Sequence, residues 1–98
     1  MNTTDIFRAI ESSSVSTLPI YASLAFQQPG SVRVLIQEKV ESRRGQLALA
    51  GVFALELSEA LNAASILVRI NEAKLRGSIT EADHQGLLKA WEIRRAAL

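Results

Sequence analysis

The chain has 98 residues, of which 48% are apolar and 21% charged, so its length and composition fit one folded domain and exclude a disordered segment. The formal net charge of +1 excludes a strong long-range field that would attract nucleic acid or anionic lipid. With no cysteine and one histidine, the sequence excludes disulfides and thiolate nucleophiles, and it leaves a single base for any catalytic triad. Fourteen alanines and thirteen leucines favour helix, because these residues have high helix propensities.

The first residues predict a cellular compartment. Acidic Asp5 and Glu11 stand around the short apolar pair Ile6 and Phe7. A signal peptide needs a basic region followed by a longer apolar run, and neither is present. We therefore expect a cytoplasmic protein.

Residues 3–28 are expected to form two short helices. Asp5 fits the first turn of the first helix, where a carboxylate interacts favourably with the helix dipole. Thr17 and Pro19 predict the start of the second helix, because the first turn does not need the hydrogen bond that proline lacks. The pair Pro29–Gly30 predicts where it ends.

Residues 31–44 are expected to form a third helix. Ser31 fits its N-cap, and the apolar residues that follow repeat at intervals of three and four. Arg43, Arg44 and Gly45 predict its end, since cations and a glycine are typical of a helix C-terminus.

A β-hairpin at about residues 18–40 is the alternative. Val32, Val34 and Ile36 alternate with other residues, and Pro29–Gly30 could form the turn. The fold would then be α+β, with this hairpin packed on a helical hairpin. The helix is favoured because Gln37, Glu38 and Lys39 are poor strand residues, and the fold class expected is all-α with about four helices.

Residues 46–76 contain no proline and predict one long helix. Its first part, Leu47 to Leu57, is apolar on every side, so it must be covered on every side. A membrane span is excluded, because only eleven uncharged residues separate Arg44 from Glu56 and a span needs about twenty. We expect another protein chain to cover the segment. The candidate interface residues are Leu47, Leu49, Val52, Phe53, Leu55 and Glu56, with Trp91 from the last helix.

Residues 81–97 predict the C-terminal helix. Thr80 followed by Asp83 resembles a capping box at its start. The short connection makes this helix antiparallel to the preceding one, so the C-terminal half is expected to be a helical hairpin. Counting outward from the turn pairs Leu87 with Ile70 and Trp91 with Ile66.

Two acidic residues, Glu81 and Glu56, are candidates for sites of chemistry. Glu81 and His84 have the spacing of a metal-binding pair, but an acid in the first helical turn is explained by the helix dipole. Glu56 falls among apolar residues, where a carboxylate needs a partner such as Arg95 or an arginine of another chain. We expect no catalytic residue, no metal and no cofactor.

Two arginine pairs are the candidates for binding DNA phosphates. They are Arg43–Arg44 and Arg94–Arg95. The helix-turn-helix pattern fails, however, because Asp83 and Gly86 stand where a recognition helix needs aliphatic anchors.

These features together predict a function. We expect residues 1–98 to form a single helical domain that is not an enzyme. It would act as a protein–protein interaction module, such as an adaptor, chaperone or inhibitor, and form a homodimer through Leu47 to Leu57. A small DNA-binding transcriptional regulator is the second hypothesis, and a subunit of a larger assembly is the third.

Overall fold

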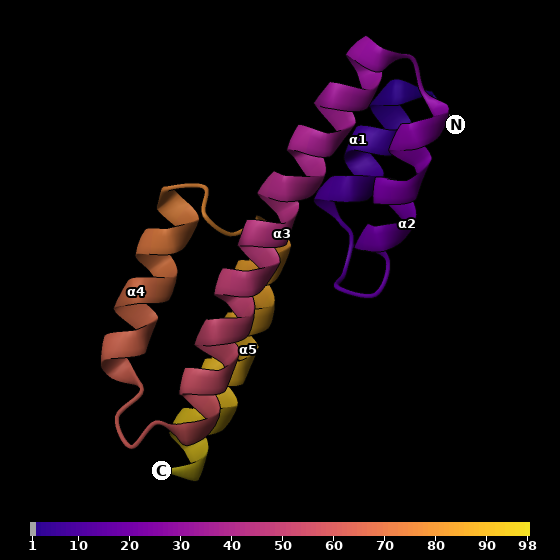
Figure 1. The fold of residues 1–98 in the computed structure, drawn as a ribbon. Helices are drawn as coiled ribbons and strands as arrows, with labels where there is room; N and C mark the ends of the chain where they lie inside the picture. The colour runs from indigo at the N-terminus through magenta and orange to yellow at the C-terminus, as the bar shows by residue number, and fades with distance from the viewer. Residues whose placement is uncertain (1) are drawn as a thin grey trace. The chain divides into compact units, whose positions relative to one another are not determined.

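The computed structural model describes residues 2–98, and all its regular elements are helical. They are α1 (Thr3–Glu11), α2 (Leu18–Leu24), the short 3-10 helix η1 (Ala25–Gln27), α3 (Gly30–Glu59), α4 (Ala64–Leu75) and α5 (Glu81–Ala97) (Figure 1). No strand occurs within residues 2–98, so the all-α prediction is confirmed.

The alternative β-hairpin at residues 18–40 is wrong. Leu18 and Ala25 are buried seven residues apart, and Ile36 and Val40 four apart, which is helical spacing. In a half-buried strand, neighbouring side chains would alternate between the core and the surface. Val34 and its neighbour Leu35 do not alternate in this way, since both are exposed.

The predicted helix break at Gly45 is also wrong, because α3 continues through this glycine to Glu59. Gly45 has no positive φ angle, and a glycine inside a helix costs only about 1 kcal/mol relative to alanine. The burial of α3 side chains that precede and follow Gly45 in the sequence outweighs this small penalty.

The expected long helix over 46–76 is broken at residues 60–63. A continuous helix of that length would extend about 46 Å and could not fold back on itself. The break brings Ile66 and Ile70 of α4 into the same core as Phe53 and Leu57 of α3. Asn62 helps to start the new helix, since its side-chain oxygen accepts a hydrogen bond of 3.0 Å from the backbone N–H of Ala64.

The residue contacts divide the chain into two compact units, one extending to Gly45 and the other beginning at Gln46. Helix α3 runs across this boundary. Whether the chain folds as the single domain expected from its length stays a prediction.

The first unit contains α1, α2, η1 and the first half of α3. Its buried apolar side chains are Ile6, Ile10, Leu18, Ala25, Ile36 and Val40. Arg43 is also buried, and its Nε and Nη2 atoms donate hydrogen bonds of 3.0 and 2.9 Å to the backbone oxygen of Ser13. Lys39 and Glu11 form an exposed ion pair at 3.0 Å between α3 and α1.

The second unit contains the rest of α3 with α4 and α5. Its buried core is made of Phe53, Leu57, Ala63, Ile66, Ile70, Ala73, Ile79 and Leu87, with Leu49 and Trp91 among the half-buried residues packed against it. Helices α4 and α5 pack as the predicted hairpin (Figure 1). Contacts between Asn71 and His84 near the turn, and between Ala63 and Trp91 far from it, show that the two helices are antiparallel.

The turn of this hairpin follows its local sequence. Gly77 has φ 73°, and Ser78 N–H donates to the oxygen of Ala73 at 2.9 Å, which closes α4 with a Schellman motif. The predicted capping box is present, since the Thr80 hydroxyl accepts from Asp83 N–H and the Asp83 carboxylate accepts from Thr80 N–H.

Candidate functional site

The apolar segment Leu47 to Leu57 is divided between the core and the surface. Phe53 is 3% exposed and belongs to the core of its own chain, so it is not available to a partner. Leu49 packs against the same core, and Leu47 is half-buried. Val52 and Leu55 lie on the other side of α3 and are exposed. The unit's own α4 and α5 therefore cover one side of the segment and leave the other side open.

Trp91 belongs mainly to the core of the second unit. Its indole N–H donates a hydrogen bond of 3.0 Å to the backbone oxygen of Ala63, and its ring packs against the buried cluster. The guanidinium of Arg95 lies 5.1 Å from the ring centroid, within the range of a cation–π contact. Trp91 is thus held by contacts inside the unit.

Glu56 has its ionic partner within the chain, but this partner is not the expected Arg95. Arg69 of α4 meets both carboxylate oxygens, at 2.7 and 3.3 Å. The same guanidinium lies 5.4 Å from the centre of the Phe53 ring. The pair is partly exposed and joins α3 to α4, so an arginine from another chain is not needed to neutralise Glu56.

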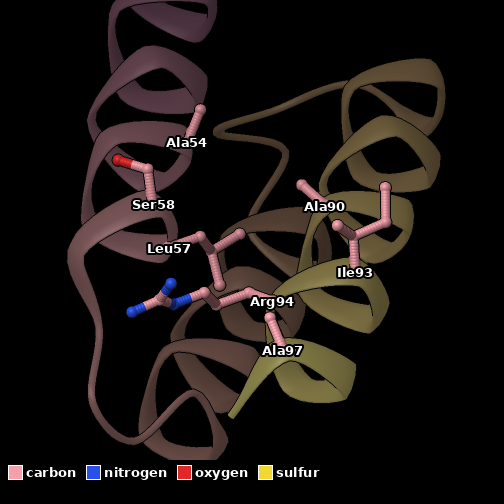
Figure 2. Close-up of a pocket in the computed structure, with 7 residues that line it drawn as sticks. All are labelled: Ala54, Leu57, Ser58, Ala90, Ile93, Arg94 and Ala97. Atoms are coloured by element: carbon pink, nitrogen blue, oxygen red, sulfur yellow. The ribbon is translucent and has the colours of Figure 1, made fainter.

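A groove of about 310 Å³ lies between the end of α3 and α5. Its lining residues are Ala54, Leu57, Ser58, Ala90, Ile93, Arg94 and Ala97. Figure 2 shows Leu57 pointing from α3 toward α5, and the Arg94 side chain extending back toward α3. Arg94 Nε donates a hydrogen bond of 2.9 Å to the backbone oxygen of Ala60. The groove walls are otherwise mostly small or apolar.

Helical spacing extends this groove into a larger surface, which we call the α3/α5 face. On α3, positions 48, 51, 55 and 58 follow one another at intervals of three and four, so they share one side of the helix. On α5, positions 86, 90, 93 and 97 do the same. The α3/α5 face consists of Ala48, Gly51, Ala54, Leu55 and Ser58 of α3 with Gly86, Ala90, Ile93 and Ala97 of α5.

The two largest side chains of the α3/α5 face are well exposed. Leu55 is 61% and Ile93 is 72% exposed. Sequence reasoning found Leu55 but missed Ile93 and its neighbours on α5. The available signal was the repeat of Ala90, Ile93 and Ala97 on the side of α5 away from Trp91.

A second set of exposed apolar residues lies on another part of the unit. Val68 and Leu75 lie on α4, and Leu61 lies in the connection that precedes it; the three are spaced by seven residues, and each is more than half exposed. The apolar residues that α4 turns inward are Ile66, Ile70 and Ala73.

The four arginines considered for DNA binding all have contacts inside the chain. Arg43 is buried against Ser13, and Arg44 forms an ion pair with Glu41. Arg94 bonds to the backbone of Ala60, and Arg95 lies over Trp91. These contacts do not favour a phosphate-binding surface made from the two pairs.

Glu81 and His84, whose spacing resembles that of a metal-binding pair, each have another partner. Glu81 forms an ion pair with Lys74 at 2.7 Å, and hydrogen bonding to Lys74 lowers the pKa of the Glu81 carboxyl. The Nε2 atom of His84 lies 2.8 Å from the side-chain oxygen of Asn71. Within residues 2–98, no three His, Asp or Glu side chains gather where they could hold a metal ion. None of the helices in the described part of the chain has the length and apolar character to cross a membrane.

Comparison with known proteins finds no relative, since no protein family, curated protein or solved structure matches the chain.

Proposed function

We propose that the chain is a non-enzymatic protein–protein interaction module that binds another protein through the α3/α5 face. The observation that carries the proposal is the exposure of Leu55 and Ile93 beside an apolar groove. Large exposed apolar side chains beside a groove are typical of an interaction site. The adaptor, chaperone and inhibitor roles expected from the sequence all need such a surface, and the cytoplasm stays the predicted compartment.

The groove favours an apolar helix as the bound element. Small residues on both walls, such as Ala54 and Ala90, let another helix approach closely. Helix-in-groove binding uses anchors at intervals of three, four and seven residues, which is also the spacing of the α5 positions that belong to the α3/α5 face.

The test compares two variants of the full chain. We expect Leu55→Asp combined with Ile93→Asp to lose the proteins that the wild-type chain captures in its native host, its own untagged copy included. Each aspartate would place a charge in the dehydrated interface.

The matched control is Val68→Asp on α4, since Val68 is 57% exposed and lies outside the α3/α5 face. It should retain the captured proteins, and far-UV circular dichroism should show both variants folded. If the double variant captures the same proteins as the wild type, the α3/α5 face is not the binding site and the proposal is wrong.

A further inference from the structure

The break between α3 and α4 replaces one helical hydrogen bond with two side-chain contacts. In a continuous helix, the backbone oxygen of Ala60 would accept a hydrogen bond from the N–H of Ala64, four residues later. In the folded chain, the Ala60 oxygen instead accepts from Nε of Arg94 at 2.9 Å. The Ala64 N–H donates to the side-chain oxygen of Asn62 at 3.0 Å. Both groups that a continuous helix would pair with each other are therefore satisfied by side chains.

The residues of the break are otherwise suited to a helix. Residues 60–63 contain no proline and no glycine, and all except Asn62 are alanine or leucine, which have high helix propensities. Ala63 has helical backbone angles, with φ −87° and ψ −12°. The Leu61 side chain is 89% exposed, so it does not hold the break in place. A change of backbone angles at a few residues would join α3 and α4 into one helix.

We propose that residues 60–63 are a hinge that opens to join α3 and α4, so that α4 and α5 pack on the α3 of a second copy of this chain. An opened chain on its own is unstable, because core residues such as Phe53 of α3 and Ile70 of α4 would be exposed to water. A second opened copy covers them with the same side chains, which is an exchange known as domain swapping. The dimer interface is then the core that the closed chain already has.

The closed and exchanged forms differ mainly at the hinge, because the core contacts are the same in both. The exchanged form gains helical hydrogen bonds across residues 60–63 and loses the contacts of Asn62 and Arg94. It also requires two copies to associate, so it is favoured at high protein concentration. Exchange requires the core to open, and we therefore expect it to be slow under native conditions.

The exchange would give one assembly two α3/α5 faces. Each α5 would lie against the α3 of the partner subunit, so each face would be built from both copies. Two linked faces bind a target with two sites more tightly than one face does, because the second binding event is intramolecular. Opening of the hinge does not depend on what the α3/α5 face binds.

Incubation of the full chain in moderate urea at increasing protein concentration, followed by size-exclusion chromatography with light scattering, tests the proposal. The wild type should give a dimer fraction that rises with concentration. Asn62→Ala combined with Arg94→Met should raise the association constant about tenfold or more, because both contacts of the closed hinge are removed. Leu61→Gly should lower it about tenfold, since glycine disfavours the continuous helix and the exposed side chain is not part of the core.

Lys89→Met is the matched control for Arg94→Met. Lys89 is also a cation on α5, but it is exposed and lies away from the hinge contacts. Its replacement should leave the dimer fraction unchanged. Circular dichroism should show every variant folded, because none of the replaced side chains belongs to the buried core.

Two spin labels distinguish exchange from association of closed chains. The chain has no cysteine, so Val52→Cys and Leu75→Cys provide exposed labelling sites on α3 and α4. In a continuous helix these positions are about 35 Å apart along the axis. In the closed chain they are much closer, because Leu49 of α3 and Arg76 of α4 line one pocket. Labelled chain mixed with excess unlabelled chain should show the long distance in the dimer and the short distance in the monomer.

Two results would overturn the inference. One is a chain with Asn62→Ala and Arg94→Met that remains monomeric at the highest concentration after incubation. The other is a dimer in which the two labels of one chain keep the short distance of the monomer. Neither result would affect the function proposed for the α3/α5 face, which is tested by the capture of another protein.

Discussion

The indole nitrogen of Trp91 lies 3.0 Å from the backbone oxygen of Ala63 and donates a hydrogen bond to it. Ala63 immediately precedes α4, and Trp91 lies in the second half of α5. The bond therefore joins the two helices at the end opposite their turn. Because Ala63 and Trp91 both belong to the core region, polar and apolar contacts hold the hairpin at the same place.

Replacing Trp91 should destabilise the second unit in two steps. Trp91→Phe removes the hydrogen bond and some ring volume, and we expect a loss of about 1–2 kcal/mol in the free energy of unfolding. Trp91→Ala also removes the aromatic packing, and the loss should be about 3–5 kcal/mol. Urea denaturation followed by circular dichroism measures both values. Equal effects of the two substitutions would show that the ring packing contributes little.

Phe53 should control the stability of the second unit rather than association with a partner. Because it is buried at the centre of the core, Phe53→Ala should cost about 3–5 kcal/mol. Its neighbour Val52 is half-exposed, so Val52→Ala should change stability by less than about 1 kcal/mol. The comparison uses thermal or urea unfolding of the two variants. A Phe53→Ala variant as stable as the wild type would mean that this side chain does not pack in the core.

Arg43 and Arg44 are adjacent in the sequence but should differ strongly in their effects. Arg43→Met removes both hydrogen bonds to the Ser13 oxygen inside the first unit, and we expect a loss of about 2–3 kcal/mol. Arg44→Met breaks only an exposed pair with Glu41 and should change stability by about 0.5 kcal/mol or less. Urea denaturation of both variants gives the comparison. Similar losses would contradict the assigned role of the buried guanidinium.

The exposed Lys74–Glu81 pair should respond to pH. Its hydrogen bond lowers the pKa of Glu81 in the folded chain, so its contribution to stability is present above the pKa of the unfolded chain. That contribution is lost as the pH falls through the folded pKa. An NMR titration should place the Glu81 midpoint below its ordinary value, and Lys74→Met should raise it. Lys89→Met is the control and should leave the midpoint unchanged.

Several features of the fold were predictable because their signals are local. The Thr80–Asp83 capping box, the stop at Gly77 and the short connection together predict the C-terminal hairpin. Proline at the start of α2 is another local signal, because its effect on the helix depends on neighbouring residues alone. Each of these signals is contained within a few residues, so no distant contact was needed to interpret it.

The end of α3 could not be predicted from local sequence. Gly45 looked like a helix terminus but is tolerated, whereas the true break at residues 60–63 contains no proline or glycine. The break is stabilised by distant side chains, since Arg94 and Trp91 of α5 bond to the carbonyl oxygens of Ala60 and Ala63. Glu56 shows the same limit, because its partner Arg69 is brought close only by the reversal of the chain.

The sequence by itself determined that this protein is all-helical, that it ends in a hairpin, and that the segment Leu47 to Leu57 is apolar on every side. Only the tertiary structure decided which side of that segment is covered. Phe53 and Leu57 face α4 and α5, while Leu55 faces outward. Helical periodicity can show that a residue is apolar and on which side it lies, but the packing of the other helices decides whether that side is core or surface.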